Sequence, residues 1–281
     1  MCATCGCSGE ATIRVIPAGG QDQEHQHAYE HGHGGRHDHG GLGHHAGHPA
    51  PAASGDGRTV ALQQKVLAKN DRLAGSNRDW LRQRAIFAIN LMSSPGAGKT
   101  TLLERTTRDL AGDVAICVIE GDQAGALDAD RMRSAGSQGV VQINTGAGCH
   151  LDAEMVAAAL RALDPPEGSV VVIENVGNLV CPALFDLGEA ARVVLASVTE
   201  GDDKPRKYPH MFSQADLVLV TKTDLLPYLT FDTARHAADV RRLSAQAQML
   251  QVSATTGAGL PDWYAWLRRN AAAAAQAGSR E

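Results

Sequence analysis

The hydrophobic positions of the chain fall into short runs that alternate with longer amphipathic stretches. Seven runs have the length and β-branched content of buried strands, at 86–92, 114–119, 140–143, 170–173, 193–198, 217–220 and 249–252. Apolar residues recur at helical spacing in 99–110, 152–163, 233–247 and 261–274, and an Ala-rich tail follows Asn270. This alternation predicts an α/β fold with a mostly parallel sheet and helices on both faces.

The N-terminal part of the chain differs in composition from the rest. Residues 58–84 carry an approximate apolar stripe, weakened around Gly75, and are predicted to form one helix ahead of the main domain at 85–281. Residues 1–57 are rich in Gly, Ala, Pro and His and contain little that could build a core. We therefore expect a flexible leader there, without structure beyond what a bound metal holds.

Charge and cysteine use restrict the partners and the compartment. The net charge of −5 gives no global basic field, so we expect no nucleic acid partner. No apolar stretch approaches the roughly 20 residues that span a bilayer, and the N-terminus lacks a signal-peptide core, so we expect a cytoplasmic protein without membrane insertion. Thiols stay reduced there, so the six cysteines are expected to be ligands or core residues, with Cys117 buried.

A glycine-rich loop follows the first strand of the main domain and opens its first helix. The sequence SSPGAGKT matches the phosphate-binding pattern G-x-x-x-x-G-K-[ST], except that Ser93 replaces the first glycine. In this pattern backbone N–H groups surround phosphates, the lysine reaches the β- and γ-phosphates, and the hydroxyl binds magnesium. The predicted nucleotide-binding residues of this loop are Ser94, Pro95, Gly96, Ala97, Gly98, Lys99, Thr100 and Thr101. Lys99 is also predicted to be catalytic, through its charge on the transferred phosphate.

Two later segments indicate which base is bound. The tetrapeptide TKTD at 221–224 directly follows an apolar strand and resembles the [NT]-K-x-D signature of GTPases. There the aspartate, here Asp224, accepts hydrogen bonds from guanine N1 and the 2-amino group, a donor pair that adenine lacks. We also predict nucleotide contacts by Lys222, and by Ser253 and Ala254, whose loop resembles the one that contacts guanine O6.

Magnesium requires hard oxygen ligands, and several carboxylates follow predicted strands. Candidates at strand ends are Glu120, Asp122 and Glu174, and we predict a magnesium site at Thr100, Asp122 and Glu174. Asp128 lies in the segment ALDADR, which we expect to be a mobile loop, and is predicted to be catalytic. It could orient the attacking water or contact magnesium, with helix capping as the alternative, and the division of roles between Asp122 and Asp128 stays open.

The extreme N-terminus carries a thiolate motif. Cys2, Cys5 and Cys7, in CATCGC, bring three soft ligands together on a short turn, which favours nickel, zinc or copper(I). With the Met1 amine as fourth donor, the set would suit square-planar nickel. Nine of the twelve histidines follow, and we predict them to be auxiliary nickel ligands for storage or delivery, at His25, His27, His31, His33, His37, His39, His44, His45 and His48.

A second group of soft ligands lies within the main domain. Cys149 and His150 follow the strand at 140–143, and Cys181 follows the strand that ends before Glu174. Both segments leave strand ends on the nucleotide-binding side, where ligands commonly bind in open α/β sheets. The residues alone leave two interpretations open, a metal site that senses the nucleotide, or a core cysteine beside a capping histidine.

The combined motifs resemble the hydrogenase nickel-incorporation GTPases of the HypB type. They are SSPGAGKTTLLE, EGD followed by LDADR, NTGAGCHLDA, IENVGNLVCPALFDLGE, TEGDDKPRKYP and TKTD, within residues 58–267, and the terminal CATCGC matches separately. The resemblance implies a dimerising, metal-handling P-loop GTPase that delivers nickel to [NiFe] hydrogenase. It implies high-affinity nickel at Cys2, Cys5 and Cys7, and nickel or zinc at Cys149, His150 and Cys181, at or near a dimer interface. It also supports Asp128 and Glu174 as magnesium or hydrolysis residues.

From this resemblance we expect GTP or GDP, Mg²⁺, Ni²⁺ and, at the second site, Ni²⁺ or Zn²⁺. The expected partners are a second copy of the chain, a small nickel/zinc accessory protein of the HypA type, and the hydrogenase large subunit precursor. Two other functions are considered. A urease-maturation GTPase also carries a His-rich leader, but CATCGC and NLVCPALFDLGE favour hydrogenase. A nickel-storage protein with a regulatory nucleotide domain would bind GTP without turning it over.

Overall fold

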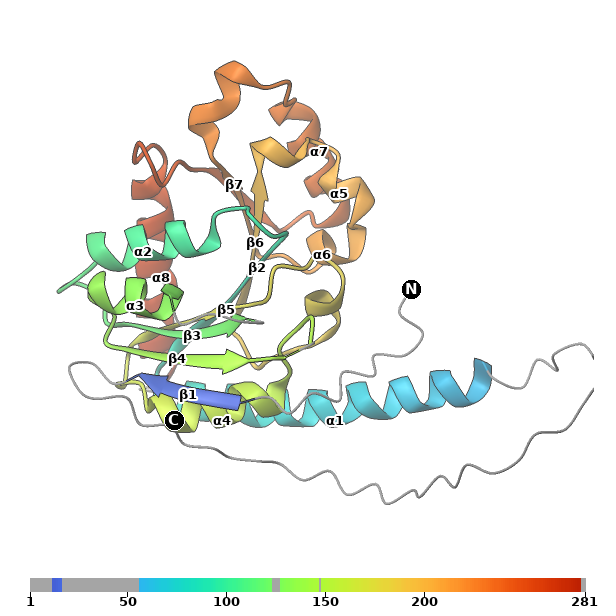
Figure 1. The fold of residues 1–281 in the computed structure, drawn as a ribbon, viewed down its shortest axis with the longest axis vertical. Coiled ribbons are helices and arrows are strands. Elements are labelled where there is room, and N and C mark those ends of the chain that lie inside the picture. Colours follow the sequence, from blue (N-terminus) through green and yellow to red (C-terminus); the bar gives the residue numbers. More distant parts are fainter. Residues whose placement is uncertain (1–11, 17–55, 123–126, 147, 279–281) are drawn as a thin grey trace, which may run out of the picture.

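The computed structural model describes residues 12–16, 56–122, 127–146 and 148–278. In these residues the strands form one sheet in the order β1-β4-β3-β5-β2-β6-β7-β8 (Figure 1). Neighbouring strands are parallel except β1 and β4, which are antiparallel. The strands are β1 (Thr12–Ile16), β2 (Phe87–Ser93), β3 (Ile116–Asp122), β4 (Gly139–Asn144), β5 (Val170–Glu174), β6 (Ala191–Ser197), β7 (Leu217–Thr221) and β8 (Gln248–Gln251). The predicted α/β class with a mostly parallel sheet is confirmed.

Helices cover both faces of the sheet (Figure 1). They are α1 (Asp56–Gln83), α2 (Lys99–Asp109), α3 (Leu127–Ser134), α4 (Ala153–Leu163), α5 (Lys204–Lys207), α6 (Pro209–Ser213), α7 (Thr233–Leu243) and α8 (Leu260–Gly278). Because successive strand residues point to opposite faces, Ile89 packs with α2, α3 and α8, whereas its neighbour Ala88 packs with α1 and α4. Met92 joins a third cluster, formed with α6 and α7 on the same face as Ala88.

The strand β1 corrects the expectation that the leader lacks regular structure. Its sequence, TIRVI, is rich in β-branched residues, and it pairs along the edge of β4 with Ile13 opposite Ile143. Ile13 also packs against the core cluster under α1 and α4. The polar and Gly-containing sequence around this short segment hid its strand signal. Asp56 and Gly57 already belong to α1, and the rest of the leader lies outside the described residues, so the domain division at residue 57 stays a prediction.

Several predicted boundaries shift by a few residues. The helix predicted at 233–247 ends at Leu243, where Ser244 takes up extended backbone, and the helix predicted at 261–274 continues through the Ala-rich tail to Gly278. The helix predicted at 58–84 spans Asp56–Gln83 as α1, but its contact face is partly polar. Val66 of the apolar stripe is 50% exposed, whereas the polar Asn70 and Asn77 are each 5% exposed.

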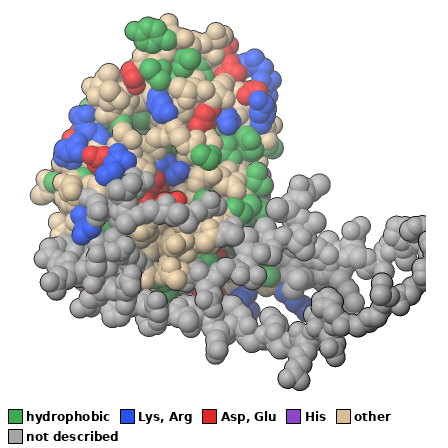
Figure 2. Space-filling model, in the orientation of Figure 1, with side chains coloured by type: hydrophobic (Ala, Val, Ile, Leu, Met, Phe, Trp, Pro, Cys, Tyr) green, Lys and Arg blue, Asp and Glu red, His purple; other side chains and the backbone are tan. Residues whose placement is uncertain are grey.

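The topology places several loops at one edge of the sheet, the one formed by the carboxyl ends of the parallel strands. The chain crosses from β2 to β3 on one side and returns through β5 to β6 on the other, so β2 lies between β5 and β6. Segments that follow the carboxyl ends of these strands meet at this edge, the usual ligand position in such sheets. On the face in Figure 2, basic and acidic side chains are interspersed. Among the described helices, none has the length and apolar character needed to cross a bilayer.

Candidate nucleotide and metal site

The glycine-rich loop joins β2 to α2 with two residues in left-handed backbone. Gly96 has φ 74° and Gly98, the residue before the helix, has φ 95°, a conformation that favours glycine. No side-chain hydrogen bond caps the helix at Gly98. The N-terminal turn of α2 can therefore bind an anion through its N–H groups and the positive end of the helix dipole.

Ser93 fits the first position of the loop in place of glycine. Its side chain is fully buried, and its φ is not among the positive values of the chain. The Ser93 hydroxyl donates to the carbonyl of Ser94 at 2.6 Å and accepts from Lys99 Nζ at 3.0 Å. This contact holds the Lys99 side chain against the phosphate loop, in which it is predicted to bind phosphate.

The oxygen donors predicted for magnesium meet beside this loop. The Thr100 hydroxyl donates to Glu174 Oε1 at 2.8 Å. Strands β3 and β5 are neighbours, with Glu120 opposite Glu174, so Asp122 lies near the same sheet edge. A hydroxyl and carboxylates are the hard donors that Mg²⁺ prefers, so these residues fit that ion. Asp128 belongs to α3 rather than to the predicted loop, and its side chain lies outside the described residues.

A pocket of about 360 Å³ opens next to the loop, at the side of β7 and β8. Its lining combines the phosphate loop with the predicted base-reading segments, and consists of Ala97, Gly98, Thr101, Leu102, Thr221, Lys222, Asp224, Leu225, Val252, Ala254 and Thr255. The TKTD segment and the loop at Ala254, far apart in sequence, thus line one cavity, whose volume lies within the range of about 300–1,000 Å³ typical of ligand pockets.

Hydrogen bonds fix Asp224, the carboxylate predicted to read the base, and connect its segment to the phosphate loop. The buried Ser253 hydroxyl donates to Asp224 Oδ1 at 2.6 Å. Thr221 donates to the Ala97 carbonyl at 2.8 Å, and Lys222 Nζ donates to the Gly96 carbonyl at 2.7 Å. Thr221, which stands where the [NT]-K-x-D signature more often has asparagine, therefore still contacts the phosphate loop. Ser253 holds Asp224 in the structure, and its predicted contact with the nucleotide stays a prediction.

The three soft ligands of the main domain converge in space. One ligand atom from each of Cys149, His150 and Cys181 lies within 4.8 Å of the others. Cys149 Sγ is 3.6 Å from His150 Nδ1. All three side chains are partly buried, and together they offer the thiolate and imidazole donors typical of nickel and zinc sites. Of the two interpretations that the residues leave open, this geometry favours the metal site.

The surroundings of His150 favour the neutral imidazole, which is the form that binds metals. Burial lowers the pKa of the His150 imidazole, against an opposing effect of Asp152, and so favours the neutral form that binds metals. The ring of Phe185 stacks on that of His150 with centroids 4.0 Å apart. In contrast, Cys117 lies in the core as predicted, where burial raises the pKa of its thiol to about 11 and makes it inert.

A buried asparagine that the sequence did not single out joins the two halves of the site. Asn175 directly follows Glu174, is 1% exposed, and accepts from the backbone N–H of Leu151 at 3.3 Å. Its Nδ2 donates to Asn90 Oδ1 of β2 at 3.2 Å. Since Leu151 follows His150, a short hydrogen-bonded path connects the predicted magnesium carboxylate to the metal-ligand segment.

Comparison with known proteins shows which family the chain belongs to. The family model described as "CobW/HypB/UreG, nucleotide-binding domain" matches residues 87–251. A hydrogenase maturation factor HypB from Azotobacter vinelandii is 47% identical over 96% of this chain and 92% of its own length. The corresponding protein of Rhizobium leguminosarum bv. viciae is 53% identical over 76% of this chain and 72% of its own. The chain belongs to the HypB family of hydrogenase maturation factors.

A solved HypB structure extends this similarity to the fold. HypB from Helicobacter pylori, in complex with nickel, is 39% identical and superposes with a TM-score of 0.67 over 72% of this chain and 95% of its own. The resemblance read from the motifs is therefore confirmed, and with it the assignment to a P-loop GTPase family.

The predicted thiolate motif and histidine tract belong to the N-terminal leader. Cys2, Cys5 and Cys7, and the nine leader histidines between 25 and 48, lie outside the described residues. Sequence reasoning also assigned no role to Glu200, although its segment TEGDD was noted. Glu200 accepts from the Ser94 hydroxyl at 2.5 Å and so contacts the phosphate loop from the end of β6.

Proposed function

We propose that the protein hydrolyses GTP with Mg²⁺ and uses the nucleotide cycle to hold and release nickel during maturation of [NiFe] hydrogenase. The observation that carries this proposal is the shared sheet edge. A phosphate loop and the predicted guanine-binding carboxylate line a pocket there, and the two thiols and the imidazole lie on segments that follow the carboxyl ends of β4 and β5. The buried Asn175 connects them, so a change at Glu174 can alter the ligand segment.

Each part of the nucleotide site has a distinct task. Lys99 pairs with the β- and γ-phosphates, and Asp224, oriented by Ser253, reads the N1 and 2-amino donors of guanine. Thr100 and Glu174, together with Asp122, would hold Mg²⁺, which supplies positive charge against the phosphates when bound. Asp128, at the start of α3, orients the attacking water or contacts magnesium.

Nickel is the cargo of the proposed cycle. Cys149, His150 and Cys181 bind nickel or zinc in a way that depends on the nucleotide, and Cys2, Cys5 and Cys7 form a separate tight nickel site. The leader histidines supply further, weaker sites. A homodimer, a small accessory protein of the HypA type and the hydrogenase large subunit precursor are the proposed partners, in the cytoplasm.

A turnover assay separates this proposal from nickel storage. Purified full-length protein with Mg²⁺ is expected to release phosphate from GTP and much less from ATP at equal concentration, because ATP leaves Asp224 without its donor pair. Phosphate release and bound nickel are measured on the same preparation. Bound nickel with no GTP turnover would favour storage, and equal turnover of ATP would contradict the base assignment.

A further inference from the structure

We infer that two buried asparagines of helix α1, Asn70 and Asn77, are positioning residues for the metal site at Cys149, His150 and Cys181. This inference rests on the proposed metal role of those three ligands. It assigns to α1, which lies outside the family-model match at 87–251, the task of fixing the two chain segments that carry them.

Asn70 bridges the two segments directly. Its Oδ1 accepts from the backbone N–H of Ala153 at 2.9 Å, and its Nδ2 donates to the carbonyl of Asp186 at 2.8 Å. Ala153 lies just after the Cys149-His150 pair, and Asp186 lies just after the turn that begins at Cys181. One amide side chain thus sets the separation of the two segments.

Asn77 repeats the bridge two helical turns later. Its Nδ2 donates to the carbonyl of Ala153 at 2.9 Å and to that of Leu187 at 3.0 Å. A spacing of seven residues returns to the same face of a helix, so both amides point at the same two segments. The two asparagines therefore satisfy backbone groups of both segments from one side.

The contact between α1 and the second segment is close. Gly188 has φ 91°, and a Cβ there would lie 2.6 Å from the Ala74 carbonyl oxygen and 2.6 Å from Asn77 Cβ. Arg78 adds an ion pair with Asp186, in which the single nitrogen Nη2 donates to both carboxylate oxygens at 2.7 Å. Such a fit leaves little room for this segment to move without α1.

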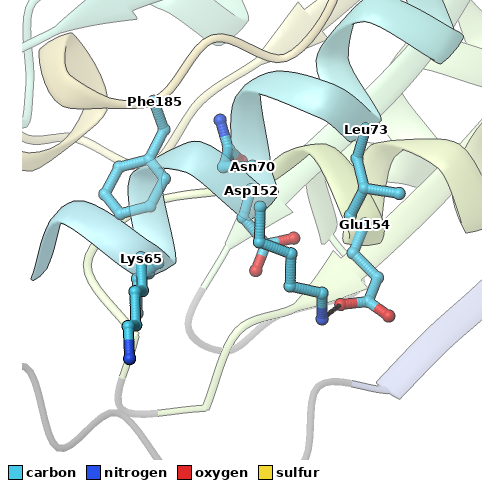
Figure 3. A pocket seen from close by; sticks show the side chains of 8 residues that line it. Lys65, Asn70, Leu73, Asp152, Glu154 and Phe185 are labelled. Atoms are coloured by element: carbon cyan, nitrogen blue, oxygen red, sulfur yellow. Dashed lines mark hydrogen bonds and ion pairs between the residues drawn. The ribbon is translucent and has the colours of Figure 1, made fainter. Parts of the chain in front are cut away.

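Phe185 connects these contacts of α1 to the predicted metal ligands. It directly precedes Asp186, whose carbonyl Asn70 holds, and its ring stacks on that of His150 at 4.0 Å. Figure 3 shows Asn70, Asp152 and Phe185 around one pocket of about 330 Å³ between α1 and the start of α4. The orientation of the His150 ring therefore depends on where α1 holds Phe185.

The test uses full-length protein in which Cys2, Cys5 and Cys7 are replaced by serine, so that thiolate-to-nickel absorption reports the main-domain site alone. Ni²⁺ is titrated against a calibrated chelator into this background and into its Asn70→Ala, Asn77→Ala and double variants. Loss of groups that orient metal ligands typically weakens binding by about 10- to 100-fold, and we expect a loss of this size in the double variant. Affinity for GTP should stay unchanged, because the asparagines do not touch the nucleotide pocket.

Two controls separate positioning from general destabilisation. Leu267→Ala removes core packing on the opposite face of the sheet, and should lower the melting temperature without weakening nickel. Lys69→Ala removes an exposed ion pair between α1 and Glu154 and should change little. Unchanged nickel affinity in the double asparagine variant, or an equal loss in Leu267→Ala, would overturn the inference. An absorption band that survives Cys149→Ser with Cys181→Ser would instead refute the metal site itself.

Discussion

Replacement of Lys99 by alanine is expected to abolish productive GTP binding. Lys99 lies at the start of α2 and is 9% exposed, and its ammonium group is held toward Ser93 within the phosphate loop. Charged hydrogen bonds contribute about 1.5–3 kcal/mol each, so loss of contacts to two phosphates predicts at least about a 100-fold weaker affinity. Binding is measured by calorimetry with GTP and Mg²⁺, and turnover by phosphate release.

The control for this variant is Lys69→Ala, which removes another lysine but at an exposed surface pair. We expect that variant to bind GTP normally. In Lys99→Ala the nickel bound by Cys2, Cys5 and Cys7 should remain, because the leader site needs no nucleotide. Normal GTP turnover by Lys99→Ala would contradict the assignment of the phosphate loop.

The Asp224→Asn substitution is expected to reverse the preference from GTP to xanthosine triphosphate. The carboxylate presents two acceptors to guanine N1 and its 2-amino group, whereas the asparagine amide presents a donor that suits the 2-oxo group of xanthine. An unsatisfied buried group costs about 1–3 kcal/mol, so GTP should bind about 5- to 150-fold more weakly. Ser253 can still donate to the asparagine oxygen, so the side chain keeps its position.

Affinities of the two nucleotides are measured side by side on both proteins. Asp262→Asn, at an exposed position in the first turn of α8, makes the same chemical change outside the pocket and should leave the preference for GTP intact. An Asp224→Asn protein that keeps the wild-type order of affinities would show that another group reads the base.

The fold could be predicted where buried strands form continuous apolar runs. Strands such as β2 and β5 are buried along their whole length, so their hydrophobic residues leave a clear signal. The strand β1 was missed because its apolar run is interrupted by Arg14 and lies in polar, glycine-rich sequence. The helix at Asp128 was missed because its sequence, LDADRMRS, has little apolar periodicity. Among the helix side chains that the structure describes, the buried Met132 packs into the core.

The candidate site also has parts that the sequence predicts and parts that depend on the fold. The phosphate loop and TKTD are each formed by consecutive residues, so the chemistry of each could be predicted from local spacing. The cluster of Cys149, His150 and Cys181 depends on two crossover connections that bring separate strand ends together, so the residues alone left it open. Polar side chains that join segments, such as Asn175, have no local signature, because their partners are backbone groups elsewhere in the fold.

The central claim, that nucleotide state controls nickel, is tested most directly by one pair of titrations. Full-length protein with Cys2, Cys5 and Cys7 replaced by serine is titrated with Ni²⁺ in its GDP form and with a non-hydrolysable GTP analogue, and thiolate-to-nickel absorption is followed. Coupling of about 1–3 kcal/mol predicts a 5- to 150-fold difference in nickel affinity between the two forms, and nickel must change nucleotide affinity by the same factor. Superimposable nickel isotherms in the two forms would contradict the account.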